Sequence, residues 1–348
     1  MPFLLIPRAA RALYIAIAAG LLGLLTVAPV AAAESAVVIM YHRFGEDRYP
    51  STNTRIEQFE DHIRELTGGG YSVKSVSDII DALRDGRELP DRTVGITMDD
   101  AYLSAYTEAF PRLQAAGLPF TLFVATDPVD RHLPGYLSWD QIREMRDEGV
   151  TIGAHSASHL HMADATPEKN RQDMQKSLDR FREELGSVPA LFAYPYGETS
   201  LAVKDVVSGF GFKTAFGQHS AAIHRVTDPL YLPRFALNET YADMDDFRLR
   251  VNTVGLPVRD ITPTDSFITG ANPPLVGFTV DPSVGSLNGL ACYHSQQGRL
   301  DMQILGTHRV EIRFPEPLPQ GRSRLNCTMP AGGGRWYWFG MQYYTATD

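Results

Sequence analysis

The sequence predicts an α/β protein followed by a small all-β domain. From Ser35 to about Val254, short apolar runs alternate with amphipathic stretches of helical length, which is typical of parallel βαβ units. After Gly255-Leu256-Pro257, prolines and glycines become frequent, the apolar runs are short and β-like, and no convincing helix follows. A long apolar segment precedes both regions, so we expect three parts: residues 1–33, 34–256 and 257–348.

Residues 1–33 have the features of a secretory signal peptide. Arg8 and Arg11 lie before a long apolar run that ends at Val30, and Ala31-Ala32-Ala33 supplies small residues for cleavage. An uncleaved membrane anchor is the alternative, because about 18 apolar residues can span a bilayer. We therefore expect an exported protein, periplasmic or extracellular, with no membrane span once the signal is cleaved.

The charge of the mature chain limits its partners. Removing Arg8 and Arg11 from the 32 basic residues leaves 30 against 41 acidic residues, a net charge of −11. This balance argues against nucleic acid or an anionic membrane surface as the main partner. It is compatible with a neutral or cationic substrate.

The first elements of the α/β region follow from apolar spacing and capping residues. Ala36–Tyr41 predicts a buried strand. The capping-box pattern Thr54-Arg55-Ile56-Glu57 opens a helix with apolar residues at helical spacing, and Gly68-Gly69-Gly70 ends it. Ser77 is expected to cap the next helix, Asp78–Arg84.

The later elements continue the alternation. The expected strands are Thr93–Met98, Phe120–Ala125, Val150–Ala154, Leu191–Tyr194 and Lys213–Phe216. The expected helices are Ser104–Ala116, Trp139–Asp147, Pro167–Leu185 and Leu201–Ser208. Helices of this length between strands indicate parallel pairing, wound either as a barrel or as a doubly wound sheet.

The two cysteines, Cys292 and Cys327, lie in the tail that we expect to form a β-sandwich. An exported protein meets an oxidising compartment, where such a pair usually forms a disulfide. A zinc site would need C-x-x-C spacing or neighbouring histidines, and His294 is the one histidine close by. We therefore predict a Cys292–Cys327 disulfide.

An aromatic stripe lies near the C-terminus. In a strand, Trp336 and Trp338 share one face, and Tyr337 and Phe339 share the other. We expect this stripe to fill the sandwich core or to pack against the neighbouring domain. Stacking on sugar rings is the alternative.

Three motifs stand at the ends of predicted strands. Thr97-Met98-Asp99-Asp100 closes the strand that begins at Thr93, and His155-Ser-Ala-Ser-His159 follows the strand Val150–Ala154. The third motif is Ala193-Tyr194-Pro195-Tyr196-Gly197. Residues at the C-terminal ends of parallel strands converge on one site, so the three motifs should meet.

The residue types in these motifs suggest a catalytic metal. Two adjacent carboxylates at the end of an apolar strand are costly unless a cation compensates them. His155 and His159 are four positions apart, so one helical turn would bring both imidazoles to one face. One carboxylate and two histidines leave metal positions open for water and substrate. Taken singly, a helix N-cap or two unrelated histidines would explain each motif, but three motifs at three strand ends are harder to explain as chance.

With these motifs the chain resembles the polysaccharide deacetylase family, carbohydrate esterase family four, over roughly residues 36–237. The segment TMDDAY resembles the family's T-F-D-D-G motif, HSASH its H-[ST]-x-x-H metal motif, and YPYG the segment that lines the substrate groove. The resemblance implies a distorted (β/α) barrel, which agrees with the alternation of elements.

The resemblance also implies the roles of individual residues. Asp99 would be the general base, and Asp100, His155 and His159 would bind one divalent metal ion. Zinc is the first choice of metal, and cobalt or nickel would also suit an Asp-His-His site. The backbone N–H of Tyr196 would stabilise the oxyanion.

Two departures from the family pattern lie within the motifs themselves. Ala101 replaces the glycine after the two acids, which is a mild change. Ala193 stands where many members have the arginine that holds the catalytic aspartate. Arg234, in Leu232-Pro233-Arg234-Phe235, is our candidate substitute, and a surface ion pair is an equally good interpretation of it.

A third departure concerns the general acid, because the family's late Leu-x-His has no clear match. The candidates are His42, His219 and His224. We prefer His42, since Met40-Tyr41-His42 closes the first strand and resembles the start of deacetylases that act on poly-N-acetylglucosamine. A hydrogen-bonded structural histidine is the alternative.

These features together predict an exported, metal-dependent hydrolase that removes N-acetyl groups from an amino-sugar polysaccharide, poly-N-acetylglucosamine or a related exopolysaccharide. A peptidoglycan deacetylase is the alternative within the same chemistry. Two alternatives belong to other classes of protein. One is a glycoside hydrolase with Asp99 or Asp100 in a carboxylate pair, and the other is a glycan-binding protein with a degenerate site.

Overall fold

The computed structural model describes residues 32–346. The expected signal peptide lies outside these residues except for Ala32–Ala33, which form the short strand β1 and pair with β6 (Leu89–Pro90). Within the described part of the chain, no helix combines the length and the apolar character that a membrane crossing requires.

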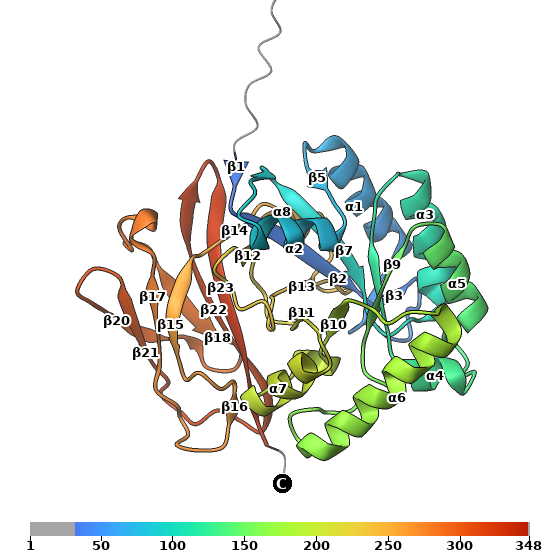
Figure 1. Ribbon diagram of the computed structural model, residues 1–348. Helices are drawn as coiled ribbons and strands as arrows, with labels where there is room; N and C mark the ends of the chain where they lie inside the picture. Colours follow the sequence, from blue (N-terminus) through green and yellow to red (C-terminus); the bar gives the residue numbers. More distant parts are fainter. Residues whose placement is uncertain (1–31, 347–348) are drawn as a thin grey trace, which may run out of the picture. The chain divides into compact units, whose positions relative to one another are not determined.

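A curled, mostly parallel sheet is the centre of the α/β region (Figure 1). In spatial order its strands are β11 (Thr214–Phe216), β10 (Leu191–Ala193), β9 (Thr151–Ala154), β8 (Thr121–Val124), β7 (Thr93–Met98), β2 (Ser35–Tyr41) and β12 (Ile223–His224). β5 (Ser72–Val73) pairs with β7, and β13 (Phe235–Ala236) pairs with β2. Among the described pairs of this sheet, β12–β2 alone is antiparallel. Parallel pairing brings the carboxyl ends of β2, β7, β9 and β10 to one edge, as expected for a distorted (β/α) barrel.

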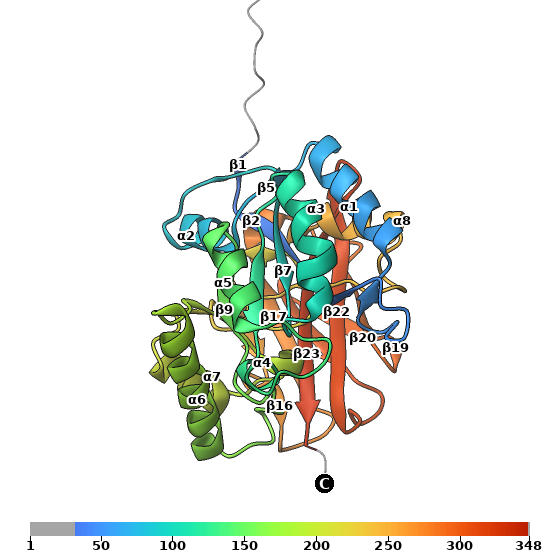
Figure 2. The ribbon, with the colours of Figure 1, turned by 90° about the vertical axis from the view of Figure 1, so that its right-hand side faces the viewer.

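Helices cover the outer side of this sheet (Figures 1 and 2). They are α1 (Ile56–Gly68), α2 (Val76–Arg84), α3 (Phe110–Ala115), α4 (Thr126–Asp130), α5 (Trp139–Asp147), α6 (Pro167–Leu185), α7 (Leu201–Gly209) and α8 (Met244–Val251). α5 and α6 have the expected bounds. The expected helix Ser104–Ala116 begins instead as a π-helical segment, Ala105–Ala109, because Pro111 has no N–H to donate and interrupts regular α-helical bonding.

Two helix caps expected from the sequence are wrong. Thr54 belongs to the short strand β4 (Asn53–Thr54), which pairs with β3 (Arg43–Phe44), so α1 starts one residue later. The side chain of Gln58 accepts a hydrogen bond from the backbone N–H of Arg55 at 3.1 Å. At α2, the hydroxyl of Ser75 rather than Ser77 accepts the N–H of Asp78, also at 3.1 Å, and the helix begins two residues earlier.

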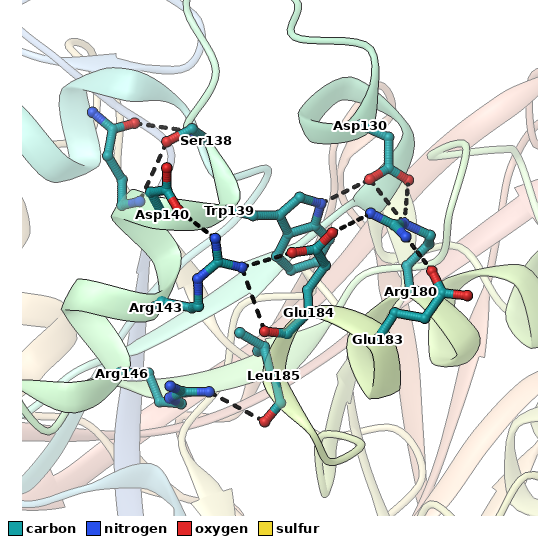
Figure 3. A network of polar contacts seen from close by, with 11 residues as sticks. Asp130, Ser138, Trp139, Asp140, Arg143, Arg146, Arg180, Glu183, Glu184 and Leu185 are labelled. Carbon is teal, nitrogen blue, oxygen red and sulfur yellow. Dashed lines mark hydrogen bonds and ion pairs between the residues drawn. The ribbon is translucent and has the colours of Figure 1, made fainter.

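A network of polar contacts joins α4, α5 and α6 (Figure 3). Arg143 of α5 contacts Glu184 of α6 at 2.6 Å. Asp130, at the end of α4, accepts hydrogen bonds from Nε1 of Trp139 at 2.7 Å and from Nε of Arg180 at 3.0 Å. These contacts join α5, which precedes β9 in the chain, to α6, which follows it; β9 is the strand that leads to His155.

Two further sheets make up the C-terminal region (orange to red in Figure 1). One contains, in order, β14 (Val254–Gly255), β23 (Arg335–Thr345), β22 (Gly321–Gly332), β18 (Ala291–His294) and β19 (Gly298–Arg299), with β16 (Phe267–Ile268) beside β23. The other contains β15 (Val258–Thr262), β17 (Val276–Val280), β21 (Arg309–Arg313) and β20 (Asp301–Leu305). The rings of Phe278 on β17 and Phe339 on β23 meet between the sheets at 4.7 Å. This is the sandwich-like arrangement expected, while the boundary after residue 256 stays a prediction.

The two cysteines are joined as predicted. Cys292 and Cys327 lie opposite each other in the antiparallel β18–β22 pair and form a disulfide. Both side chains are buried. The bond therefore crosses two neighbouring strands of the larger C-terminal sheet.

Part of the aromatic stripe is packed, whereas Trp336 is 39% exposed. The ring of Trp338 meets Phe235 of β13 edge-on at 5.2 Å, and its Nε1 donates to Oδ1 of Asn326 at 3.0 Å. Phe339, on the opposite face, lies in the sandwich core. The expected packing against the core and the neighbouring region is confirmed for these two residues.

Candidate active site

The three sequence motifs meet at the carboxyl edge of the parallel sheet. Asp99 and Asp100 follow β7, His155 follows β9, and Tyr196 lies in the turn after β10. Asp100, His159 and Tyr196 have φ angles of 75°, 55° and 59°, in a region that non-glycine residues seldom occupy. Strained backbone of this kind clusters at functional sites because the surrounding structure must hold it in place.

Asp100, His155 and His159 form a compact group of potential metal ligands. Oδ1 of Asp100 lies 3.2 Å from Nε2 of His155 and 3.0 Å from Nε2 of His159. The three ligand atoms all lie within 4.8 Å of one another. Oδ1 of Asp100 and Nε2 of His155 are buried and, among the described residues, make no hydrogen bond of acceptable geometry. Unsatisfied buried polar atoms are costly, and a cation between them would satisfy both.

The protonation of His155 suits a metal ligand. Its Nδ1 lies 2.7 Å from the carbonyl oxygen of Ala193, which can only accept a hydrogen bond. A proton therefore sits on Nδ1, which leaves Nε2, the nitrogen that faces Asp100, as the atom that can bind a metal. Metal-binding histidines are commonly oriented in this way through their second nitrogen. The residues present thus fit a divalent cation held by one carboxylate and two imidazoles.

Burial and charge act against each other at this group. Burial alone would raise the pKa of Asp100, but its close contacts with His155 and His159 hold that pKa well below the usual range. Burial alone would lower the pKa of His155, but Asp100 in contact with it and the charge of Asp99 raise it. The local field therefore favours positive charge between these side chains, which a bound cation would provide.

Asp99 is clamped by Arg234. Nη1 of Arg234 donates to Oδ1 at 2.7 Å and Nη2 to Oδ2 at 2.8 Å, and neither side chain is exposed to solvent. Arg234 is itself fixed, because Nε donates to the carbonyl of Gly217 at 3.0 Å and Nη1 to the hydroxyl of Thr97 at 3.2 Å. Burial would raise the pKa of Asp99, but the Arg234 and His155 charges lower it, so the carboxylate stays ionised. A surface ion pair, the other interpretation of Arg234, is wrong.

The three candidate general acids lie in different places. His42 follows β2 at the carboxyl edge; burial lowers its pKa, while the nearby charges of Asp100 and Asp99 act to raise it. His224 pairs with Ser35, the first residue of β2, and so lies at the opposite end of that strand. His219 is buried against Tyr231, and burial lowers its pKa to about 3. Of the three, the structure brings His42 to the motif residues.

Tyr196 is packed between two histidines. Its ring meets His159 edge-on at 4.5 Å and stacks on His161 at 4.0 Å with an interplanar angle of 2°. Nδ1 of His161 lies 2.8 Å from Oε2 of Glu198, a buried carboxylate. Neither His161 nor Glu198 is among the site residues expected from the sequence, although each follows a motif residue by two positions.

Comparison with known proteins identifies a family and several relatives. Residues 86–215 match the family model described as Polysaccharide deacetylase, a range that contains all three motifs but neither His42 nor Arg234. Bacillus subtilis YxkH is 27% identical over 199 residues, which cover 54% of this chain and 70% of that protein. The Escherichia coli K12 protein named poly-beta-1,6-N-acetyl-D-glucosamine N-deacetylase is 26% identical over 226 residues, covering 52% of this chain and 33% of that protein.

Among solved structures, that of IcaB from Ammonifex degensii is similar in fold and sequence. It is 27% identical, with a TM-score of 0.53, and the match covers 62% of this chain and 94% of that chain. The expected barrel type is thereby confirmed. The chain spans most of IcaB, but only a third of the length of the E. coli relative.

Proposed function

We propose, from the premise that this chain is a member of the polysaccharide deacetylase family and hence an amide-hydrolysing enzyme, that it removes N-acetyl groups from an exported amino-sugar polysaccharide. The observation that carries the proposal is the buried Arg234–Asp99 pair beside the Asp100-His155-His159 group. The carboxylate of Asp99 is kept ionised and oriented by Arg234, and the carboxylate of Asp100 faces the imidazoles of His155 and His159. This arrangement suits hydrolysis of an amide by an activated water.

The side chains can be given distinct tasks in this reaction. A divalent cation held by Asp100, His155 and His159, zinc in the first instance and cobalt or nickel otherwise, would supply Lewis acidity that lowers the pKa of water and polarises a carbonyl. Asp99 accepts a proton from the attacking water as the new C–O bond forms at the acetamide carbon. Arg234 keeps Asp99 ionised and fixes the direction of its free lone pairs.

The remaining tasks fall to Tyr196 and His42. The backbone N–H of Tyr196 donates a hydrogen bond to the oxygen that gains negative charge. His42 gives a proton to the amide nitrogen as the C–N bond breaks, so that acetate and a free amino sugar leave. His42 is preferred because it ends the strand next to β7 in the sheet, whereas His224 lies at the other end of β2.

The relatives support an exopolysaccharide as the substrate. The name of the E. coli protein specifies poly-β-1,6-N-acetylglucosamine, and IcaB is similar over nearly its whole length. We therefore propose poly-N-acetylglucosamine or a related polymer, with peptidoglycan as the second candidate. The signal-peptide pattern in residues 1–33 and the Cys292–Cys327 disulfide support a periplasmic or extracellular site of action.

The test is release of acetate from a panel of acetylated glycans. The purified mature protein is incubated with poly-N-acetylglucosamine, peptidoglycan and chitin oligomers, and acetate and free amines are quantified together. We expect equal amounts of both products and the highest kcat/KM on poly-N-acetylglucosamine. New reducing ends without acetate would point to a glycoside hydrolase. Binding of a glycan without release of either product would point to a glycan-binding protein.

A further inference from the structure

Two side chains of the C-terminal sheet hold the backbone of the YPYG turn. Nε2 of Gln342, on β23, donates to the carbonyl oxygen of Tyr196 at 3.0 Å. Nη1 of Arg322, on β22, reaches the same oxygen at 3.5 Å. Gln342 is almost completely buried. In the β22–β23 register, Arg322 lies opposite Tyr344 and Arg324 opposite Gln342, so both donors project from the same face of the sheet.

Arg322 also reaches Tyr196 by a second route. Its Nε lies 3.5 Å from Oε1 of Glu198, whose other oxygen contacts His161 at 2.8 Å. The ring of His161 stacks on the ring of Tyr196, and the guanidinium of Arg322 lies 5.5 Å from the centre of that ring. The carbonyl and the side chain of Tyr196 are thus both held through contacts that include Arg322.

Tyr196 needs such support because its conformation is strained. Its φ of 59° and ψ of 2° place a non-glycine residue in the left-handed region, a strained conformation that persists only where the surrounding structure imposes it. The next residue is held too, since the hydroxyl of Tyr231 donates to the carbonyl of Gly197 at 3.0 Å. The direction of the Tyr196 N–H and the position of its ring against His159 both depend on this turn.

The C-terminal sheet packs closely enough on the barrel to fix the position of the Tyr196 carbonyl. A Cβ at Gly340, two residues before Gln342, would lie 2.1 Å from the carbonyl oxygen of Ser220, so the strand and the barrel meet backbone to backbone there. Nearby, the hydroxyl of Ser266 donates to the carbonyl of Thr199 at 3.0 Å, which ties the segment after the YPYG turn to the same region. Gln342 therefore has little freedom to move relative to Tyr196.

We propose that Gln342 and Arg322 are positioning residues for deacetylation, and that the C-terminal sheet completes the active site by holding Tyr196. The inference rests on the proposed function, because it assigns these side chains to the turn whose N–H faces the developing oxyanion. Neither side chain acts on the substrate itself. Their effect is transmitted through the Tyr196 carbonyl and through the stacked His161.

The inference is tested with Gln342→Met, which keeps the length of the side chain and removes its donor. We expect kcat to fall about 10–10²-fold, because small misplacements of catalytic groups have effects of this size. The KM, the metal content and the melting temperature should stay close to those of the wild type. The matched control is Gln303→Met, on the exposed strand β20, which should retain the wild-type kcat.

A second variant guards against misfolding of the first. Arg322 is 40% exposed, so Arg322→Met should fold, and it should also lower kcat more than it raises KM. If the wild type is active and both variants are folded, loaded with metal and unchanged in kcat, the inference is wrong while the proposed function stands. A wild type that releases no acetate from any of the glycans would overturn the proposed function, and the inference with it.

Discussion

Arg234 donates one hydrogen bond to each carboxylate oxygen of Asp99, at 2.7 and 2.8 Å, and both side chains are fully buried. A guanidinium forms this bidentate contact because its planar fork matches the carboxylate. The pair makes an ionised carboxylate tolerable in the interior, immediately beside a group of three potential metal ligands. The proposed base and the proposed ligand are thus adjacent in sequence but held by different partners.

Breaking the Arg234–Asp99 pair should lower both the free energy of unfolding and kcat. Arg234→Met leaves Asp99 as an uncompensated buried charge, so we expect the free energy of unfolding to fall by about 3–5 kcal/mol, measured by denaturant titration. Arg225→Met is the control, because Arg225 forms an exposed pair with Glu34 at 3.1 Å and should change stability by less than about 1 kcal/mol. Equal losses in the two variants would contradict the role given to the buried pair.

Substitutions of the adjacent residues Asp99 and Asp100 should impair the enzyme in different ways. Asp99→Asn should keep its metal but lose most of its turnover, because an amide cannot accept the proton of the attacking water. Asp100→Asn should lose affinity for the metal first, so excess zinc should restore part of its activity. Metal content and kcat, measured on both purified variants, distinguish the roles. Equal loss of metal from both would show that base and ligand were wrongly assigned.

His42 is expected to act as the general acid. His42→Ala should retain its metal and lose about 10²–10⁴-fold in kcat, the usual size of such a contribution. His224→Ala is the matched control, since His224 lies at the far end of β2 and should leave kcat unchanged. Near-normal turnover of His42→Ala would assign the proton to another group.

Part of this site could be predicted from the sequence, because the signals involved are local. Strand ends, helix lengths and the spacing of the motif residues placed Asp100, His155 and His159 together, and α6 has its expected bounds. The expected cap of α2 was wrong because Ser75 and Ser77 compete at neighbouring positions, and only the folded backbone selects Ser75. The expected cap of α1 was wrong because Thr54 pairs in the short strand β4.

Long-range partners were harder to predict. Arg234 and Asp99 are 135 residues apart, so the sequence offered Arg234 only as a candidate, with a surface position equally open. Gln342 and Tyr196 are 146 residues apart, and no pattern near Gln342 indicates a contact with the YPYG turn. Such contacts depend on how the C-terminal sheet packs on the barrel, which apolar periodicity does not specify.

The disulfide should matter for stability rather than for chemistry. Replacing Cys292 and Cys327 together by serine should lower the free energy of unfolding by about 2–4 kcal/mol, because the disulfide reduces the conformational entropy of the unfolded chain. Both cysteines point into the sandwich core, away from the face that carries Gln342. The double variant should therefore keep the wild-type kcat at temperatures where it is folded. A large loss of kcat in the folded double variant would contradict this separation.

The central claim is that Asp100, His155 and His159 hold a metal ion that the deacetylation requires. The most direct measurement is acetate release from poly-N-acetylglucosamine by the wild type after a chelator has removed its metal, and again after one equivalent of zinc is added. We expect activity to disappear and then to return, with one ion bound per chain, and His155→Ala to bind none and to stay inactive. Full acetate release by protein that contains no detectable metal would contradict the account.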